Sequence, residues 1–189
     1  MKTSKIEALE AFITDLEISE NELTDWFNSR GKDKSGLIPT KLPLVYRKGN
    51  EITVEKGLDL NRKDELWGIQ LLSGVMVALQ CGAGYNVIAT TWGQVKEFAQ
   101  TMRFNDKPGI LPSKNVLKEY WGEVEKAKFA ATVNVLKENE IAADGYRGCL
   151  WCSEEYFPDY AYFFGLNYGG YGWYSKYDPT TRDRVALAF

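Results

Sequence analysis

The residues best suited to chemistry in this chain are a pair of cysteines and three carboxylates near the C-terminal end. Cys149 and Cys152 form a CxxC, the spacing used by redox centres and by many zinc sites. Glu154, Glu155 and Asp159 follow, and two such carboxylates could act as the acid and base of a glycosidase. Histidine is absent, so the commonest general base and metal ligand is missing.

Local structure argues against both kinds of site. Residues 148–152 are expected to form a strand, on which residues three apart point to opposite faces, so Cys149 and Cys152 would share neither a disulfide nor a metal ion. Together with Cys81 they make three cysteines, which does not suggest a disulfide framework. The carboxylates fit a solvated acidic turn or a brace for the strand. We therefore expect a protein that is not an enzyme and that uses no metal and no cofactor.

Aromatic residues dominate the segment around these carboxylates. Residues 151–177 hold 12 of the 26 aromatic residues of the chain (9 Phe, 6 Trp and 11 Tyr), interleaved with glycine, serine and asparagine. This mixture is typical of antibody loops, because tyrosine offers a large contact area and a hydroxyl at a low cost in conformational entropy. Aromatic anchors also dominate the measured binding energies of protein interfaces. The segment predicts a ligand-binding surface made of Tyr156, Phe157, Asp159, Tyr160, Phe163, Asn167, Tyr168, Tyr171, Trp173, Tyr174, Tyr177, Asp178 and Arg182.

Simpler interpretations of the same residues stay open. The rings could instead fill the hydrophobic core, and some of them must do so. Arg182 and Arg184 lie on one face of the predicted last strand, where they could reach a ligand or form a salt bridge with a carboxylate.

Composition excludes several classes of partner. The chain has 189 residues, of which 44% are hydrophobic, enough for one domain with a core and a small appendage. Its net charge of −3 argues against nucleic acid and against an anionic membrane surface. No apolar run is long enough to insert into a membrane, and the N-terminus lacks a signal-peptide core. We expect a virion-associated or cytoplasmic protein, or a cell-surface protein if a leader has been removed.

The elements that must position these residues follow an α+β order. Amphipathic helices are expected at 4–16 and 19–30, and an extended stretch at 37–45, so residues 1–56 form an appendage that could make a homo-oligomer. Residues 57–189 form the main domain, with an antiparallel sheet. It contains a hairpin at 66–79, a turn at 81–84, helices starting near Thr91 and Ser113 (the second broken, on to Leu136), and strands from Cys149 onward.

Four segments resemble a known family. They are Thr-Trp-Gly-Gln-Val at 91–95, Leu-Pro-Ser at 111–113 before a helix, Trp-Cys-Ser-Glu-Glu-Tyr at 151–156, and the closing Arg-Asp-Arg-Val-Ala-Leu-Ala-Phe at 182–189. Over residues 64–189 the chain resembles the C-type-lectin-like domains of gut bacterial surface proteins, of the "major paralogous domain" type. It also resembles the variable proteins of diversity-generating retroelements. Cys152, Glu154, Asp183 and Val185 depart from the family pattern.

The resemblance implies a C-type-lectin-like fold, with two helices and a twisted antiparallel sheet. On strand 161–167 it implies that Tyr162, Phe164 and Leu166 point inward, whereas Phe163, Gly165 and Asn167 point outward. The Glu-Pro-Asn and Trp-Asn-Asp triplets of calcium-dependent lectins are absent, so calcium ligation of that kind is not expected.

The function implied is adhesion to a cell-surface protein or glycan. The first hypothesis is a receptor-binding protein whose aromatic C-terminal surface is diversified by a retroelement, in a phage or a gut bacterium. The alternative is a static adhesin or pilus module of the same fold. An enzyme related to the formylglycine-generating group would need a cysteine pair in a pocket, which the strand placement disfavours.

Overall fold

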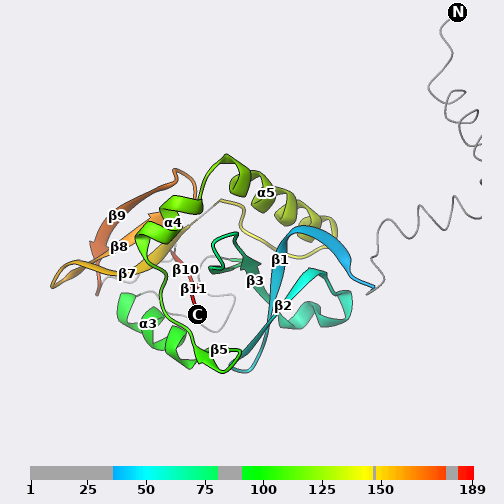
Figure 1. Ribbon diagram of the computed structural model, residues 1–189, viewed down its shortest axis with the longest axis horizontal. Coiled ribbons are helices and arrows are strands. Elements are labelled where there is room, and N and C mark those ends of the chain that lie inside the picture. The colour runs from blue at the N-terminus through cyan, green and yellow to red at the C-terminus, as the bar shows by residue number, and fades with distance from the viewer. Residues whose placement is uncertain (1–35, 81–90, 147, 178–182) are drawn as a thin grey trace, which may run out of the picture. The chain divides into compact units, whose positions relative to one another are not determined.

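The computed structural model describes residues 36–80, 91–146, 148–177 and 183–189 (Figure 1). Within these ranges the chain has the predicted α+β composition, with two β-sheets and few helices. Several expectations lie outside the described residues, namely the helices at 4–16 and 19–30, the turn at 81–84, and the site residues Asp178 and Arg182. None of the helices in the described ranges is both long and apolar enough to cross a membrane.

The first sheet has seven strands in the order β11-β4-β3-β1-β2-β5-β6. β3 pairs antiparallel with β1 and β4, but β2 pairs in parallel with β5. We expected an antiparallel sheet, and this sheet is mixed. Its strands are β1 (Ile38–Lys48), β2 (Glu51–Leu58), β3 (Leu66–Gln70), β4 (Met76–Ala78), β5 (Arg103–Phe104), β6 (Lys107–Pro108) and β11 (Ala186–Leu187).

The sheet begins earlier in the chain than expected. Residues 38–48 and 51–56, which fall within the predicted appendage of residues 1–56, belong to strands of this sheet, and Leu44 is completely buried. Two prolines, Pro39 and Pro43, make a paired strand unfavourable here because neither has an N–H to donate. Pairing with β3 starts at Leu44, beyond both prolines, so the missing donors are not needed in this ladder.

The hairpin predicted at 66–79 is confirmed. β3 and β4 pair antiparallel, and the Leu71 N–H donates to the Val75 carbonyl (2.8 Å) to close the turn between them. The two backbones approach so closely that a β-carbon on Gly68 would collide with the Val77 carbonyl. Close approach of backbone, not a turn, therefore requires glycine at this position.

The two predicted helix starts are also confirmed. The Thr91 side chain and Gln94 form a reciprocal capping box, and the Ser113 hydroxyl caps the next helix. That second helix is broken, as expected; the structure places the break at Trp121 and Gly122, and the helix continues beyond it. The helices are α3 (Trp92–Thr101), α4 (Lys114–Tyr120), α5 (Glu123–Glu138) and a short 3₁₀ helix, η1 (Leu60–Glu65).

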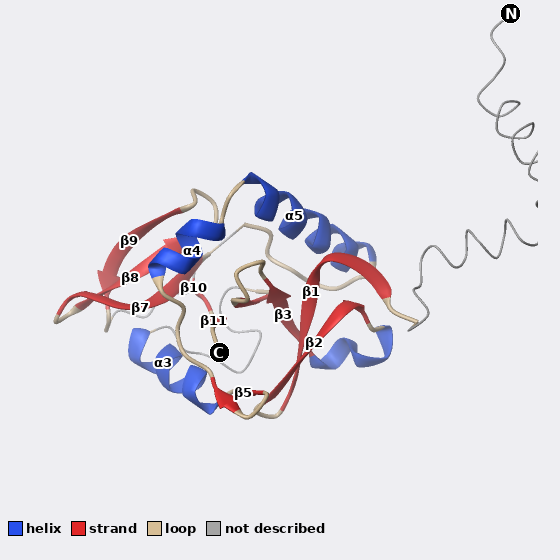
Figure 2. Ribbon diagram, in the orientation of Figure 1, coloured by secondary structure: helices blue, strands red, loops and turns tan. Residues whose placement is uncertain are grey.

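The second sheet carries most of the aromatic segment. Its strand order is β10-β7-β8-β9, with β7–β8 and β8–β9 antiparallel and β10 parallel to β7. Helix α4 packs on its middle strand, β8, as seen in Figure 2. The strands are β7 (Cys149–Phe157), β8 (Tyr160–Gly165), β9 (Gly170–Ser175) and β10 (Asp183–Arg184).

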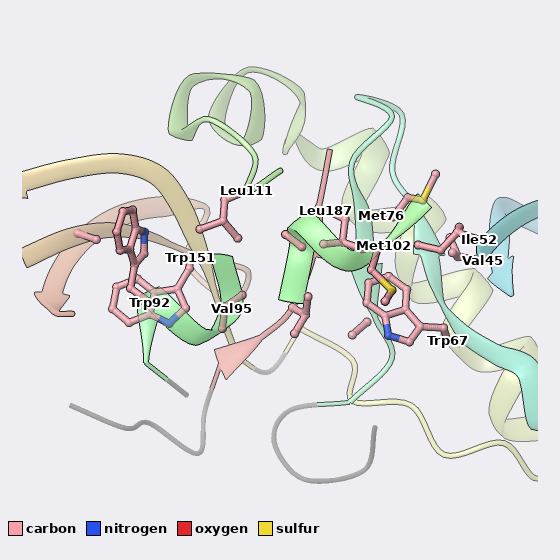
Figure 3. Packing of buried hydrophobic residues seen from close by; sticks show 14 residues of the cluster. Val45, Ile52, Trp67, Met76, Trp92, Val95, Met102, Leu111, Trp151 and Leu187 are labelled. Carbon is pink, nitrogen blue, oxygen red and sulfur yellow. The ribbon is translucent and has the colours of Figure 1, made fainter. Parts of the chain in front are cut away.

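One hydrophobic cluster receives side chains from both sheets and from α3. In Figure 3, Trp92 and Trp151 lie at one end of this cluster and Trp67 at the other. The indole N–H of Trp92 donates to the Cys152 carbonyl (2.8 Å), which fixes α3 against β7. The core thus joins the aromatic sheet to the larger sheet.

Arg184 is completely enclosed, at 1% exposure, so it does not reach a ligand on the exposed surface. Its guanidinium donates to the carbonyl oxygens of Ala78 (2.8 Å) and Leu79 (2.9 Å) at the end of β4. It also donates to those of Asp144 (2.6 Å) and Gly145 (2.8 Å) in the loop after α5. The fork of donors on an arginine suits several carbonyls at once. Arg184 therefore contributes to the frame and not to the exposed surface.

Glu125, in the first turn of α5, is a second buried charged residue. One of its oxygens accepts a hydrogen bond from the Leu72 N–H in the β3–β4 turn, and the other has no hydrogen-bond partner among the described residues. Burial raises the pKa of this carboxyl group, against the smaller opposing effect of its backbone hydrogen bonds. Burial in the fold therefore disfavours the charged form of this group relative to the same carboxyl in water.

Alanine substitutions at two glycines should have opposite effects. Gly68→Ala would force a β-carbon into the Val77 carbonyl, and we expect the free energy of unfolding to fall by about 1–3 kcal/mol. Gly93→Ala, inside α3 with open space around its β-carbon, should raise it by about 0.5–1 kcal/mol. Urea denaturation followed by circular dichroism measures both. A neutral Gly68→Ala variant would contradict the close strand approach.

Replacing Glu125 by glutamine should flatten the dependence of stability on pH. A group whose pKa is raised on folding contributes stability that is complete below its unfolded pKa, near 4.5, and is lost as the pH rises through the folded pKa. We expect the free energy of unfolding of the native protein to fall, relative to that of Glu125→Gln, as the pH rises above about 4.5. Urea denaturation at a series of pH values from 4 upward is the measurement, and parallel curves would contradict the raised pKa.

Candidate ligand-binding surface

The register of β8 and β9 sorts their aromatic residues onto two faces of the sheet. Tyr162 is paired directly with Trp173, so these two side chains share one face. Their neighbours Ala161 and Tyr174 are also paired, and they share the opposite face. Ala161 is completely buried in the main core cluster. One face of the sheet therefore packs on the core, and the other carries Tyr162 and Trp173.

Five side chains on this second face form a continuous set of ring contacts, which we name the aromatic face. The Tyr156 ring stacks on Trp173 at 5.4 Å between centroids and 11° between planes, and Tyr160 meets Trp173 edge-on at 5.4 Å. Tyr162 links the Tyr156 ring (5.3 Å) to the Tyr171 ring (5.8 Å). Stacked and edge-on arrangements at these separations are favourable for aromatic pairs. The members are Tyr156, Tyr160, Tyr162, Tyr171 and Trp173.

The aromatic face is open to solvent although its rings touch one another. The exposed fraction is 37% for Tyr160 and 52% for Trp173, with Tyr156 and Tyr171 between them. Phe157, at the end of β7, adds a further exposed ring packed edge-on against Tyr156 at 4.4 Å. The described residues therefore present a contiguous patch of exposed rings on this face of the sheet.

Two lysines of α4 border the aromatic face. The Lys114 ammonium lies 3.7 Å from the centroid of the Tyr162 ring and 5.1 Å from that of Tyr171. The Lys118 ammonium lies 5.3 Å from the same Tyr171 centroid. These are cation–π contacts, which hold both ammoniums beside the rings. Neither lysine forms an ion pair with any carboxylate of the described residues.

The other predicted site residues do not join this face. Tyr174 is exposed on the opposite side of β9, and Tyr177 is exposed beyond the end of that strand. Tyr168, in the β8–β9 turn, covers the backbone of Gly165, so that its ring is partly packed. Asp159 and Asn167 are exposed in the two turns of the sheet, which place them at opposite ends of β8.

The predicted alternation of inward and outward side chains on strand β8 is wrong at Phe163 and Gly165. Phe164 and Leu166 are buried, as expected, but Phe163 is half-buried against the core cluster and Gly165 is buried. Tyr162, expected inside, is only partly buried. The reason is that both faces of the sheet are covered near its base, one by the core and the other by Trp121, whose ring meets Phe164 edge-on. Burial changes along β8 as well as across it.

The candidate catalytic carboxylates take part in local structural contacts. Both oxygens of Glu154 accept a hydrogen bond from the Lys114 N–H (3.2 and 3.0 Å), at the start of α4. Glu155 forms an ion pair with the Lys176 ammonium (2.8 Å), which also donates to the Pro158 carbonyl (2.7 Å). The hydrogen bond from Lys176 lowers the pKa of Glu155. These contacts fit the brace that we considered for this acidic segment.

Cys149 and Cys152 lie on strand β7, as predicted. Cys152 is completely buried, and burial raises the pKa of its thiol to about 12. A thiolate is therefore not present at this position near neutral pH, although nucleophilic and metal-binding cysteines require one. In the described part of the chain no three His, Cys, Asp or Glu side chains are grouped to hold a metal ion.

Three residues of the surface were not predicted as site residues. Tyr162 was assigned to the core by family resemblance, and Lys114 and Lys118, which lie on the helix predicted to start near Ser113, were not singled out. The two lysines are four residues apart, a spacing that places side chains on one side of a helix. That spacing could have predicted a paired basic edge, but not the sheet face that it borders.

Removing the Lys176 ammonium should change the titration of Glu155. Because the lysine holds the pKa of Glu155 down, Lys176→Met should bring that pKa back up toward its ordinary value. In the native protein this carboxylate contributes stability above its unfolded pKa, and that contribution is lost as the pH falls through the lower folded pKa. Carboxyl-carbon NMR measures the titration directly. Lys56→Met on β2 is the matched control, and an unchanged Glu155 titration in Lys176→Met would contradict the ion pair.

Comparison with protein families, with curated proteins and with solved structures finds no match for this chain.

Proposed function

We propose that this chain is a non-enzymatic ligand-binding protein and that the aromatic face is its binding surface. The observation that carries the proposal is the connected set of exposed rings on one face of a sheet whose other face packs on the core. A core role would leave these rings enclosed, but four of the five are more than a third exposed. A purely structural module would not need a surface of exposed, connected rings.

The geometry suits binding because the rings are already ordered. Each ring is held by a β-strand backbone and by contact with its neighbours, so little side-chain entropy remains to be lost when a ligand arrives. Tyrosine and tryptophan also combine apolar area with a hydrogen-bond donor. These properties are typical of the few residues that supply most of the binding energy in an interface.

We further propose that the fold is C-type-lectin-like and that the protein is an adhesin or receptor-binding protein of the retroelement-diversified kind, acting on a cell-surface glycan or protein. The support is the order of elements, with capped helices starting at Thr91 and Ser113 followed by an aromatic β-sheet, together with the four motifs. A reverse transcriptase gene and a near-repeat of the C-terminal coding sequence beside this gene are the expected genomic signature. Finding neither would contradict the diversified version.

Two neighbouring substitutions on β9 test the binding surface. Trp173→Ala removes the centre of the aromatic face, and we expect it to weaken binding by about 2 kcal/mol, or roughly 30-fold in Kd. Tyr174→Ala is the matched control, because Tyr174 has a similar exposure (44% against 52%) on the other face of the same strand. Binding is measured on a glycan array and against biotinylated cell-surface proteins, with thermal melting to check folding. Equal effects of the two substitutions would contradict the proposal.

A further inference from the structure

We infer that the ligand of the aromatic face is an acidic saccharide, whose carboxylate or sulfate group is held by Lys114 and Lys118. This inference rests on the proposed function and adds the chemical class of the ligand. Three observations carry it: the two unneutralised lysines, the unused hydroxyls of the tyrosines, and the size of the exposed ring surface.

The lysines supply the preference for an anion. Both ammoniums lie close to the Tyr171 ring, at 5.1 and 5.3 Å from its centroid, so two positive charges border one edge of the aromatic face. By contrast, Lys126 and Lys176 are neutralised by Glu123 and Glu155. Two neighbouring ammoniums that form no ion pair favour an anionic group placed beside them. An anionic group placed between them would relieve their mutual repulsion.

Neither ammonium is paired with a carboxylate of the described residues, and this includes Glu119 of α4 itself. Glu154 of β7 faces the start of α4, and its oxygens accept hydrogen bonds from the Lys114 backbone N–H and from the Ser153 hydroxyl. The Glu155 carboxylate is engaged by Lys176. The two nearest acidic residues of β7 are therefore committed to structural contacts, and the two ammoniums stay available.

The tyrosines supply hydrogen-bonding groups beside apolar surface. The hydroxyls of Tyr46 and Tyr146, elsewhere in the fold, are engaged with backbone partners. Those of Tyr156, Tyr160, Tyr162 and Tyr171 make no hydrogen bond with any described residue. A saccharide presents C–H faces and hydroxyl groups together, which matches ring surface edged by unused phenol hydroxyls.

The size of the surface favours a saccharide over a folded protein. If a full aromatic side chain offers about 200 Å², the exposed fractions of the aromatic face amount to roughly 400 Å². A standard protein interface takes about 800 Å² from each partner. The aromatic face alone is about half of that, an area that a few sugar rings could cover.

The test is a glycan array on which each sialylated, uronate-containing or sulfated glycan is printed beside its neutral parent. We expect the native protein to bind the acidic member of a pair at least tenfold more tightly, and this preference to fall as sodium chloride is raised. The double substitution Lys114→Met and Lys118→Met keeps the apolar stems and should abolish the preference while binding to the neutral parent is retained. Lys56→Met, an exposed lysine on β2, is the control for the loss of charge and should keep the preference.

The outcomes separate this inference from the proposed function. The inference of an acidic ligand is wrong if the native protein binds acidic and neutral glycans equally. It is also wrong if the preference for acidic glycans survives the double lysine substitution. If the native protein binds immobilised polyglutamate but no glycan, the inference that the ligand is a saccharide is wrong. If glycans bind and Trp173→Ala has no effect on any of them, the aromatic face is not the site and the proposed function fails. Thermal melting of each variant confirms that it is folded.

Discussion

The arrangement of the two sheets depends on the burial of one guanidinium. Arg184 cannot be taken out of water without partners, because an unpaired buried charge is very costly. Its hydrogen bonds to Ala78, Leu79, Asp144 and Gly145 bring together the end of β4 and the loop after α5. Arg184 itself is paired with Leu150 of β7. One side chain thus ties the first strand of the aromatic sheet to the larger sheet.

The chain around Arg184 completes this connection. Asp183 and Arg184 lie in the second sheet as β10, and two residues later Ala186 and Leu187 pair with β4 in the first sheet as β11. The Ala78 N–H donates to the Val185 carbonyl between these two strands (2.9 Å). With β7 fixed in this way, β8 and β9 extend outward from it. Near the base of the sheet both faces are covered, one by the core cluster and the other by Trp121, whereas the rings of the aromatic face that lie beyond Trp121 are exposed to solvent.

Local rules predicted the parts of the fold that local contacts determine. The capping box at Thr91 and the serine cap at Ser113 could be identified from sequence, because each depends on residues a few positions apart. The joining of β1 to β3 and the enclosure of Arg184 could not, because their partners lie far away in the chain. The same limit applies to the site. Tyrosine content predicted an exposed surface, but pairing between strands decides which face each ring joins, and only the fold brings Lys114 and Lys118 beside it.

Along strand β9, positions that are restricted by packing alternate with positions that are exposed to solvent. A β-carbon at Gly172 would lie 2.8 Å from the Phe163 ring, and one at Gly170 would lie 3.3 Å from the Tyr168 ring, so both positions are restricted by packing. Tyr171 and Trp173, which alternate with them, project from the other side and touch no core residue of the main cluster. Natural selection can therefore replace every second side chain of this strand and leave the frame intact. Such a strand separates the residues that maintain the fold from the residues that set the chemistry of the exposed face.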